Sequence, residues 1–299
     1  MPSILSKALL ASLKAMFPQI SAMDVYRQRE AQETVCKLVN PSDKSTAFKE
    51  YSLNNVKCMW ISPKTGYIPN TEKLIVYFHG GAYRTGSLNY ACILGARFAE
   101  KTGYNVLTFE YRLSPENKYP CALDDAYAVY EYILKLNYKP ENILFTGESA
   151  GGNLLILLIL KLIKENRGTP CAAVCLSPWT DMTLSAVSCR KNADKDPIID
   201  PKSLKRSAHE YAGNIPLTDP ELSPLYADMK TFPPTLIQAG GNEVLLDDSI
   251  SFYNKLKKLN INCKLHIYEG MCHIFQLFPI PEAFEALDEA AHFIIKMLR

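Results

Sequence analysis

The feature that most constrains the fold is the hexapeptide Gly147-Glu-Ser-Ala-Gly-Gly152, which lies between two apolar runs, residues 142–146 and 153–164. The first run predicts a short buried strand and the second a helix. A G-x-S-x-G sequence between a strand and a helix imposes a sharp turn, because the glycines two residues before and after the serine remove side chains that would collide there. We therefore expect Ser149 Oγ to stand out at the carboxyl end of the strand.

The same turn places the N–H of Ala150 at the start of a helix, where a developing anion can be held. A plain loop rich in serine and glycine would also fit the five-residue pattern. The strand before it and the helix after it favour a catalytic turn over such a loop.

Around this turn, helical and strand-like segments alternate along the chain. The predicted helices span residues 89–101, 121–136, 153–164, 248–259 and 281–297, and the predicted strands span residues 33–39, 55–61, 73–78, 105–109, 142–146, 172–176, 235–239 and 262–268. Pro41, Pro63, Gly66 and Pro69 mark turns between the early strands. The alternation predicts an α/β fold, a three-layer sandwich in which a mostly parallel sheet of about eight strands carries helices on both faces.

Two segments depart from the alternation. Residues 3–17 form a predicted helix with an apolar stripe (Leu5, Leu9, Leu13, Met16 and Phe17), ended by Pro18, and a second helix is expected over residues 21–32. The stripe is either membrane-seeking or packed on the rest of the protein, and with only two nearby lysines we favour packing. Residues 177–234 are rich in proline and irregular apart from a helical stretch at 202–211, which is typical of a functional loop or lid. We expect one domain spanning residues 1–299.

Composition argues against several classes of partner. The 33 Lys and Arg residues against 31 Asp and Glu residues leave a net charge of +2 without a basic run, so nucleic acid is not an expected partner. The nine cysteines are scattered and odd in number, as reduced buried thiols are, and Cys171 and Cys175 have no further ligands spaced for zinc. We expect no metal and no cofactor. No cleavage pattern follows the short apolar stretch at 8–13, and the run 154–160 is too short to cross a bilayer, so we expect a cytoplasmic protein without stable membrane insertion.

A serine hydroxyl needs a neighbouring base, and the base needs a carboxylate to orient it. His273 directly follows the strand at 262–268, at the edge where the carboxyl ends of parallel strands gather. His266 lies inside that strand, His292 inside the last helix and His209 in the insertion, which favours structural roles for them. His273 is therefore the predicted base.

His79-Gly80-Gly81-Ala82-Tyr83 follows the strand at 73–78 in the same way. Two glycines at this place allow the main chain to turn its N–H groups toward the serine, which is how an oxyanion hole is built in hydrolases of this class. The motif is weak alone and strong beside the serine turn.

Taken together, these motifs resemble the hormone-sensitive-lipase-like branch of the α/β-hydrolase fold, a family of carboxylesterases and lipases. The resemblance spans nearly the whole chain and rests on His79-Gly-Gly, Tyr111-Arg-Leu-Ser-Pro-Glu116, Asp124-Asp125, the hexapeptide 147–152, the loop 243–247 and Gly270-Met-Cys-His273. Ala82 stands where the family usually has a third glycine, and Glu148 where it usually has aspartate. The simplest structural readings are an Arg112–Glu116 pair and a helix cap at Asp124 and Asp125.

The resemblance implies Ser149 as nucleophile, the N–H groups of Gly81, Ala82 and Ala150 as oxyanion hole, and a loop shaped by His79 and Gly80. It also implies a cap over the acyl pocket, formed by residues of about 1–45 and 178–230.

Three carboxylates are candidates for the acid that orients His273, namely Glu243, Asp247 and Asp248. Chain order fits all three, because each lies between the serine and the histidine. Glu243 follows the strand at 235–239 closely, whereas Asp247 and Asp248 precede the next helix, where a short carboxylate serves as N-cap. The family's D-x-L-x-D loop aligns with Glu243-Val-Leu-Leu-Asp247 and agrees with Glu243. Glutamate adds a methylene and lengthens the reach to His273.

The predicted function is a serine carboxylesterase that hydrolyses acetyl to hexanoyl esters through a covalent acyl-enzyme. Bulky Trp179 and Tyr211 in the insertion would limit the acyl pocket, although Trp179 equally suits the core of the cap. One rival is a non-catalytic small-molecule receptor on the same fold, which the retained His273 argues against. A second is an interfacial lipid-binding protein anchored by residues 3–17. The sequence leaves the natural ester, amide cleavage and the oligomeric state open, and a homodimer is compatible with it.

Overall fold

The computed structural model describes residues 2–39, 45–53, 55–64 and 72–299. The described strands form one eight-stranded sheet in the order β1-β2-β4-β3-β5-β6-β7-β8. Strands β3 to β8 run parallel to one another. Strand β2 pairs with β4 in the antiparallel sense, and β1 pairs antiparallel with β2 at the edge of the sheet. The strand bounds are Thr46–Leu53 (β1), Val56–Pro63 (β2), Leu74–Phe78 (β3), Asn105–Glu110 (β4), Ile143–Glu148 (β5), Ala172–Leu176 (β6), Thr235–Gly240 (β7) and Cys263–Tyr268 (β8).

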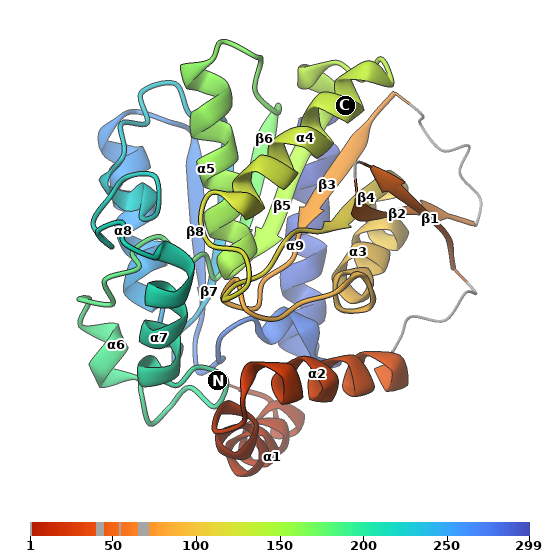
Figure 1. Cartoon of the computed structure of the whole chain (residues 1–299). Coiled ribbons are helices and arrows are strands. Elements are labelled where there is room, and N and C mark those ends of the chain that lie inside the picture. The colour runs from red at the N-terminus through yellow and green to blue at the C-terminus, as the bar shows by residue number, and fades with distance from the viewer. Residues whose placement is uncertain (1, 40–44, 54, 65–71) are drawn as a thin grey trace.

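Helices cover both faces of the sheet, as the alternation predicted. One face carries α3 and α9, and the other carries α4, α5 and α8 (Figure 1). The described helices are Ile4–Ser21 (α1), Val25–Val39 (α2), Leu88–Thr102 (α3), Cys121–Lys135 (α4), Ala150–Lys164 (α5), Ser188–Lys191 (α6), Pro201–Ala212 (α7), Leu246–Lys258 (α8) and Pro281–Met297 (α9), with single 3₁₀ turns at Pro140–Asn142, Pro224–Tyr226 and Phe275–Leu277.

The central strands are apolar throughout because each contributes to two cores. In β3, Leu74, Val76 and Phe78 pack with α4 and α5, while Ile75 and Tyr77 pack with α3 on the other face. This division follows from the alternation of side chains along a strand. The loops that follow the parallel strands therefore gather at one edge of a rigid, doubly covered sheet.

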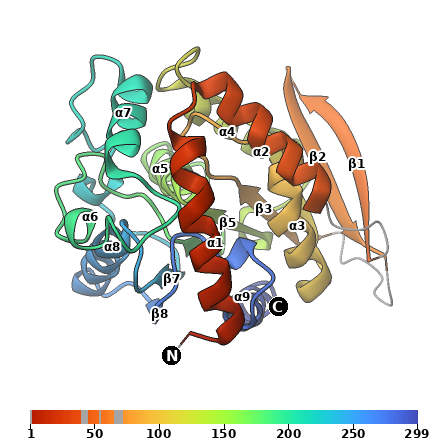
Figure 2. The same ribbon diagram turned by 90° about the horizontal axis from the view of Figure 1, so that it is seen from below.

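Helices α1, α2, α6 and α7 lie together at one end of the molecule, which Figure 2 shows from below. Pro2 packs against Gly270, in the loop that leads to His273. Arg29 of α2 bonds the loop that follows β3. The N-terminal segment thus contacts the loops that follow β3 and β8, and α7 of the insertion contacts the loop after β3 through the ion pair of Glu210 with Arg84.

Two predictions for the N-terminal region were wrong. The predicted strand at 33–39 is the second half of α2, because no glycine or proline interrupts the helix and Val25 and Cys36, eleven residues or three turns apart, are buried on one face. The first strand is instead β1, which the sequence hides because it is largely polar, as an edge strand can be. Pro18 lies inside α1, which continues to Ser21. The predicted turns at Pro41, Gly66 and Pro69 lie outside the described residues, and Pro63 ends β2.

The apolar stripe of α1 packs only in part. Leu13 is buried, and Leu9 and Leu10 pack against a core cluster that includes Met271 and Phe275, whereas Leu5 and Met16 are exposed. Among the described residues, no helix combines the length and the apolar character needed to cross a membrane.

The tie between α2 and the body of the protein gives a test of this arrangement. Arg29 donates to both carboxylate oxygens of Glu116 at 2.8 Å, to the carbonyl of Ser114 at 2.8 Å and to that of Arg84 at 2.7 Å. We expect Arg29→Ala to lower the free energy of unfolding by about 1–3 kcal/mol, because two carbonyls and a carboxylate lose their donor.

The matched control is Arg27→Ala on the same helix. The Arg27 side chain is 75% exposed and lies 3.5 Å from Asp24, so its loss should change stability by about 0.5 kcal/mol or less. Urea denaturation of both variants makes the comparison. Equal losses in the two variants would show that Arg29 does not anchor α2.

Candidate active site

Ser149 occupies a strained turn between β5 and α5. Its φ of 54° and ψ of −121° lie outside the regions that non-glycine residues favour. A side chain on Gly147 or Gly151 would collide with the carbonyl of Phe78 at the end of β3. The two glycines are therefore required by the close approach of β3, whose last carbonyl leaves no room for a side chain at either position.

His273 lies beside the serine in the loop after β8. Its Nε2 is 2.9 Å from Ser149 Oγ, and the two residues are only 2% and 5% exposed. This is hydrogen-bonding distance for a base that takes the proton of a serine. The structure thus brings together the two residues that the sequence analysis selected as nucleophile and base.

Glu243 approaches the other nitrogen of the imidazole. Its Oε2 is 3.6 Å from His273 Nδ1, too long for a hydrogen bond, and the same oxygen accepts from Ser177 Oγ at 2.6 Å and from Gly240 N at 3.1 Å. Ser177 Oγ also accepts from the N–H of Ile274 at 3.3 Å, next to His273. Ser177 therefore links the acid and the base, a role that the sequence analysis missed although this serine directly follows β6 at the same edge.

Asp247 and Asp248 are engaged elsewhere. Asp247 accepts from the N–H of Ser188 at 2.8 Å, and Asp248 accepts from those of Thr180 and Asp181 at 2.7 and 2.8 Å. The N-cap assignment was wrong for both, because α8 already starts at Leu246. Burial raises the pKa of Asp248 to about 8, and this carboxyl anchors the chain beyond β6 to α8.

The loop after β3 contains consecutive residues with positive φ. The φ values are 107° for Gly81, 54° for Ala82 and 60° for Tyr83, so a residue with a Cβ does adopt the left-handed region at Ala82. Within the described part of the chain, none of the N–H groups of Gly81, Ala82 and Ala150 donates a hydrogen bond to the protein. Unpaired donors close to a serine are what an oxyanion hole requires.

Two buried groups hold this loop. Glu148 is fully buried, and its Oε1 accepts from Gly80 N at 2.7 Å and from Tyr77 OH at 3.1 Å, while burial raises the pKa of its carboxyl to about 7. His79 stacks on Tyr111 with ring centres 4.2 Å apart, and its Nδ1 is 2.8 Å from the carbonyl of Gly80. Burial lowers the pKa of His79 to about 4, so the ring is neutral and shapes the loop.

The insertion is tied to the same loop through aromatic and amide contacts. Tyr83 stacks on Tyr211 of α7 with ring centres 3.7 Å apart, and its hydroxyl donates to Asn153 Oδ1 at 2.6 Å. Asn153 Nδ2 in turn donates to the carbonyls of Trp179 and Leu222. Trp179 and Tyr211 are fully buried, and the N–H of Trp179 donates to the carbonyl of Ser149 at 3.1 Å.

The remaining acidic motifs are paired differently from the prediction. Arg112 does not pair with Glu116 but with Asp125, which accepts from its backbone N–H at 2.8 Å and from its guanidinium. Glu116 pairs with Arg29. Asp125 is buried as this anchor and does not cap α4.

The other histidines lie away from the serine. His266 contacts Glu289 at 3.0 Å, and His292 lies near the carbonyl of Asp288 on α9. His209 belongs to the last turn of α7. Among the described residues, no group of three or more His, Cys, Asp and Glu side chains is arranged to hold a metal ion.

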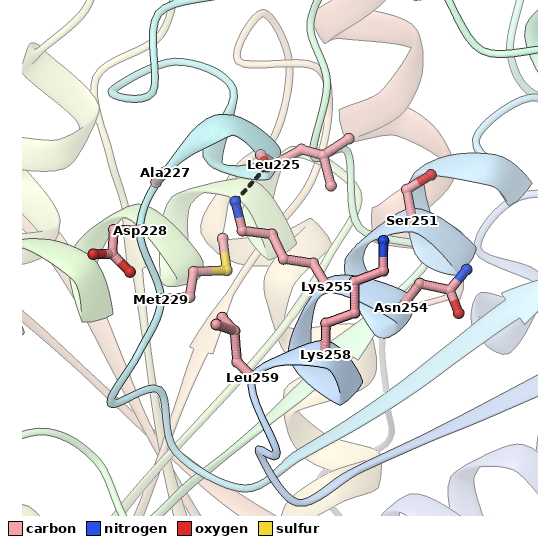
Figure 3. A pocket seen from close by; sticks show the side chains of 9 residues that line it. All are labelled: Leu225, Ala227, Asp228, Met229, Ser251, Asn254, Lys255, Lys258 and Leu259. Atoms are coloured by element: carbon pink, nitrogen blue, oxygen red, sulfur yellow. Dashed lines mark hydrogen bonds between the residues drawn. The ribbon is translucent and has the colours of Figure 1, made fainter.

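A hollow of about 560 Å³ lies outside this site, between α8 and the segment at 225–229 (Figure 3). Lys255 crosses it to donate to the carbonyl of Leu225 at 2.7 Å, as the dashed line shows. None of its lining residues is a predicted site residue: Leu225, Ala227, Asp228, Met229, Ser251, Asn254, Lys255, Lys258 and Leu259. The chemistry described above therefore does not use this hollow.

Comparisons with known proteins agree with the geometry. A family model described as alpha/beta hydrolase fold matches residues 75–277. An esterase of Acinetobacter venetianus is 36% identical over 227 residues, which cover 75% of each chain, and an acetyl-hydrolase of Streptomyces hygroscopicus is 30% identical over 79% of this chain and 78% of its own. The crystal structure of an esterase from the bacterial hormone-sensitive lipase family superposes with a TM-score of 0.90 at 31% identity, covering 97% of this chain and 98% of that one.

The α/β sheet and the serine turn thus define a hydrolase. The chain belongs to the hormone-sensitive-lipase-like esterases of the α/β-hydrolase fold, as the motifs predicted. It is a carboxylic ester hydrolase.

The electrostatics of His273 give a prediction for the pH dependence. Burial acts to lower its pKa, but the carboxylate of Glu243, with those of Asp196 and Glu148, outweighs burial and raises the pKa above 6.5. A base must be neutral to accept a proton, so we expect kcat/KM to fall as the pH falls through a value above 6.5. Glu243→Gln removes the carboxylate that raises the pKa of His273 most and leaves the imidazole buried. The acid limb, the fall of kcat/KM on the acid side, should therefore move to lower pH in this variant.

A pH–rate profile with an acetyl ester measures this limb. Glu148→Gln is the control, because the Glu148 carboxylate also raises the pKa of His273 but has a smaller influence on it than Glu243. Its acid limb should move less than that of Glu243→Gln. An acid limb of the wild-type protein centred below pH 6.5, or one that does not move in Glu243→Gln, would contradict the assignment of Glu243 as the main group that raises the pKa of His273.

Proposed function

We propose that the chain hydrolyses short-chain esters, acetyl to hexanoyl, through a covalent acyl-enzyme on Ser149, with His273 as base and Glu243 as orienting acid. The observation that carries the proposal is the 2.9 Å contact between His273 Nε2 and Ser149 Oγ at the end of β5. The non-catalytic receptor is disfavoured because this pair is intact and the relatives named above are esterases.

In the proposed reaction, Ser149 Oγ forms a bond to the ester carbonyl carbon while its proton passes to His273 Nε2. The carbonyl oxygen becomes an anion that the N–H groups of Gly81, Ala82 and Ala150 stabilise. The bond to the alkoxy group then breaks, and His273 returns the proton to the departing alcohol. Water attacks the acyl-enzyme by the same steps in reverse order, which releases the acid and restores Ser149.

Glu243 is the proposed acid because its Oε2 lies 3.6 Å from His273 Nδ1, and among the described residues no other carboxylate lies within ion-pair distance of that nitrogen. Asp247 and Asp248 are occupied by the main chain of the insertion. The extra methylene of glutamate suits a carboxylate that reaches the imidazole from beside Ser177.

The preference for short acyl groups rests on bulk near the nucleophile. The backbone N–H of Trp179 bonds the carbonyl of Ser149, and Tyr211 stacks on Tyr83, in the loop that contains the proposed oxyanion-hole donors. The side chains of Trp179 and Tyr211 are fully buried. A relative is named acetyl-hydrolase, and crystals of another, 27% identical with a TM-score of 0.92, were soaked with p-nitrophenyl butyrate. We also propose that α1, α2 and residues of about 178–230 form a cap within a single domain. Cytoplasmic location and a homodimer stay predictions from the sequence.

Variants of the three residues test the proposed chemistry. Ser149→Ala should remove nearly all turnover, because the members of a triad act as a unit. Glu243→Gln should lower kcat by roughly 10³ to 10⁴, the scale expected when the orienting carboxylate is lost. Asp247→Asn keeps an acceptor for the N–H of Ser188 and should lose far less. Steady-state kinetics on an acetyl ester make the comparison, and an inactive Asp247→Asn beside an active Glu243→Gln would transfer the role to Asp247.

A series of p-nitrophenyl esters tests the acyl preference. We expect kcat/KM to be higher for chains of about two to six carbons than for longer ones, because Trp179, whose backbone N–H bonds the carbonyl of Ser149, and Tyr211, which stacks on Tyr83, would shorten the proposed acyl site. Higher efficiency on the dodecanoate than on the butyrate would refute the preference and leave the triad assignment untouched.

A further inference from the structure

Three polar residues of the insertion, Ser188, Asn192 and Asp196, lie four residues apart on one face. Backbone hydrogen bonds from Asn192 N to the carbonyl of Ser188 and from Asp196 N to that of Asn192, both 2.9 Å, carry the turn of α6 onward to residue 196. All three side chains are buried, whereas Arg190 and Lys195 between them are exposed. Polar side chains aimed inward from an irregular insertion need buried partners.

Those partners are the main chain of Glu243 and Val244. Ser188 Oγ donates to the carbonyl of Val244 at 2.7 Å, Asn192 Nδ2 donates to the carbonyl of Glu243 at 2.9 Å, and Asp196 Oδ2 accepts from the N–H of Val244 at 2.9 Å. The carbonyl of the proposed catalytic acid and both polar groups of the next residue are thus held by side chains from about fifty residues away.

A second contact fixes the same loop where it enters α8. The N–H of Ser188 donates to Asp247 Oδ2 at 2.8 Å, and the N–H of Asp247 donates back to Ser188 Oγ at 3.1 Å. Figures 1 and 2 both show α6 beside α8. The loop 243–247 is therefore clamped to the insertion at both ends.

The position of this loop matters because the Glu243 carboxylate lies slightly beyond hydrogen-bonding distance of His273. Its Oε2 is 3.6 Å from His273 Nδ1, and His273 Nδ1 has no hydrogen-bond partner among the described residues. A misplacement of about 1 Å in a catalytic group can cost on the order of 10²-fold in rate.

We infer that Ser188, Asn192 and Asp196 are positioning residues, which act through the main chain of residues 243 and 244 to hold the Glu243 carboxylate in reach of His273. The inference rests on the proposed function, in which Glu243 orients the base. It assigns part of the insertion to the catalytic machinery and distinguishes that part from a cover over the substrate.

A double-mutant cycle tests the inference with p-nitrophenyl acetate. Asn192→Ala should lower kcat about 10- to 100-fold and leave KM within about twofold, because substrate contacts are unchanged. In a Glu243→Gln background the same change should cost less than about threefold, since the group it positions is already lost. A residue that only stabilises the fold would give the same loss in both backgrounds.

Asp196 separates positioning from charge. Asp196→Asn keeps an oxygen that accepts from the N–H of Val244 and should retain at least about half of the wild-type kcat, whereas Asp196→Ala should lose about as much as Asn192→Ala. If Asn and Ala were equally damaging, the charge of Asp196 and not its hydrogen bond would be what matters, and the inference would be wrong for this residue. Ser188→Ala removes only a hydroxyl and supplies a variant that folds should the others fail to do so.

The matched control is Ser223→Ala. Ser223 is buried in the same insertion and bonds Met182 N at 2.8 Å and the carbonyl of Leu217 at 2.6 Å, away from the acid loop. Ser223→Ala should lower the melting temperature about as much as Asn192→Ala does and leave kcat within about twofold of the wild-type value.

The outcomes separate the inference from the proposed function. An active Ser149→Ala would refute the proposed function. An active Glu243→Gln would remove Glu243 from the proposed triad, and the inference would fall with that assignment. A Glu243→Gln variant that is nearly inactive, together with Asn192→Ala and Ser188→Ala at wild-type kcat, would overturn the inference alone. An equal fall in kcat for Ser223→Ala would overturn it as well.

Discussion

The close approach of β3 to the turn at Ser149 is the constraint on which the site depends. Gly147 and Gly151 have no room for a side chain because the carbonyl of Phe78 lies against them, and Ser149 between them takes a φ of 54°. Strain of this kind persists only where the surroundings over-determine it. Here the surroundings are parallel strands buried on both faces, and the pairing of β3 with β5 brings the loop after β3, with its proposed oxyanion-hole donors, next to the serine after β5.

Because the site is buried, its polar side chains depend on hydrogen bonds from other parts of the protein. Ser149 and His273 are almost fully covered, so polar groups that water would otherwise satisfy must find protein partners. Ser177 donates a hydrogen bond to Glu243, Glu148 accepts one from Gly80 in the loop after β3, and Asn153 donates one to the carbonyl of Leu222 in the insertion. The same desolvation shifts pKa values in opposite directions: it raises that of Glu148 and lowers that of His79, and at His273 neighbouring carboxylates overcome it.

The sequence predicted what depends on local pattern. The serine turn, the helices α3, α4, α5, α7, α8 and α9 and the strands from β3 onward follow from apolar periodicity and glycine, and the structure confirms these elements within a few residues, whereas the short helix α6 was not predicted. It did not predict partners that are distant along the chain. Asp248 resembles an N-cap in its own segment, but it accepts hydrogen bonds from the N–H groups of Thr180 and Asp181, almost seventy residues earlier in the chain. The segment 33–39 was misassigned for a different reason: taken alone it resembles a strand, but it continues the helix α2.

The distance of 3.6 Å between Glu243 Oε2 and His273 Nδ1 bears on how such a site accelerates a reaction. In the proposed mechanism, His273 becomes a cation when it takes the proton of Ser149, and the attraction of a buried carboxylate for it then rises sharply in a low-dielectric setting. An interaction that is weak in the resting enzyme and strong with an imidazolium stabilises the transition state more than the ground state, which is the only kind that raises kcat. The inferred role of Ser188, Asn192 and Asp196 fits this proposal, because their hydrogen bonds to the main chain of residues 243 and 244 oppose a displacement that would take the carboxylate away from His273.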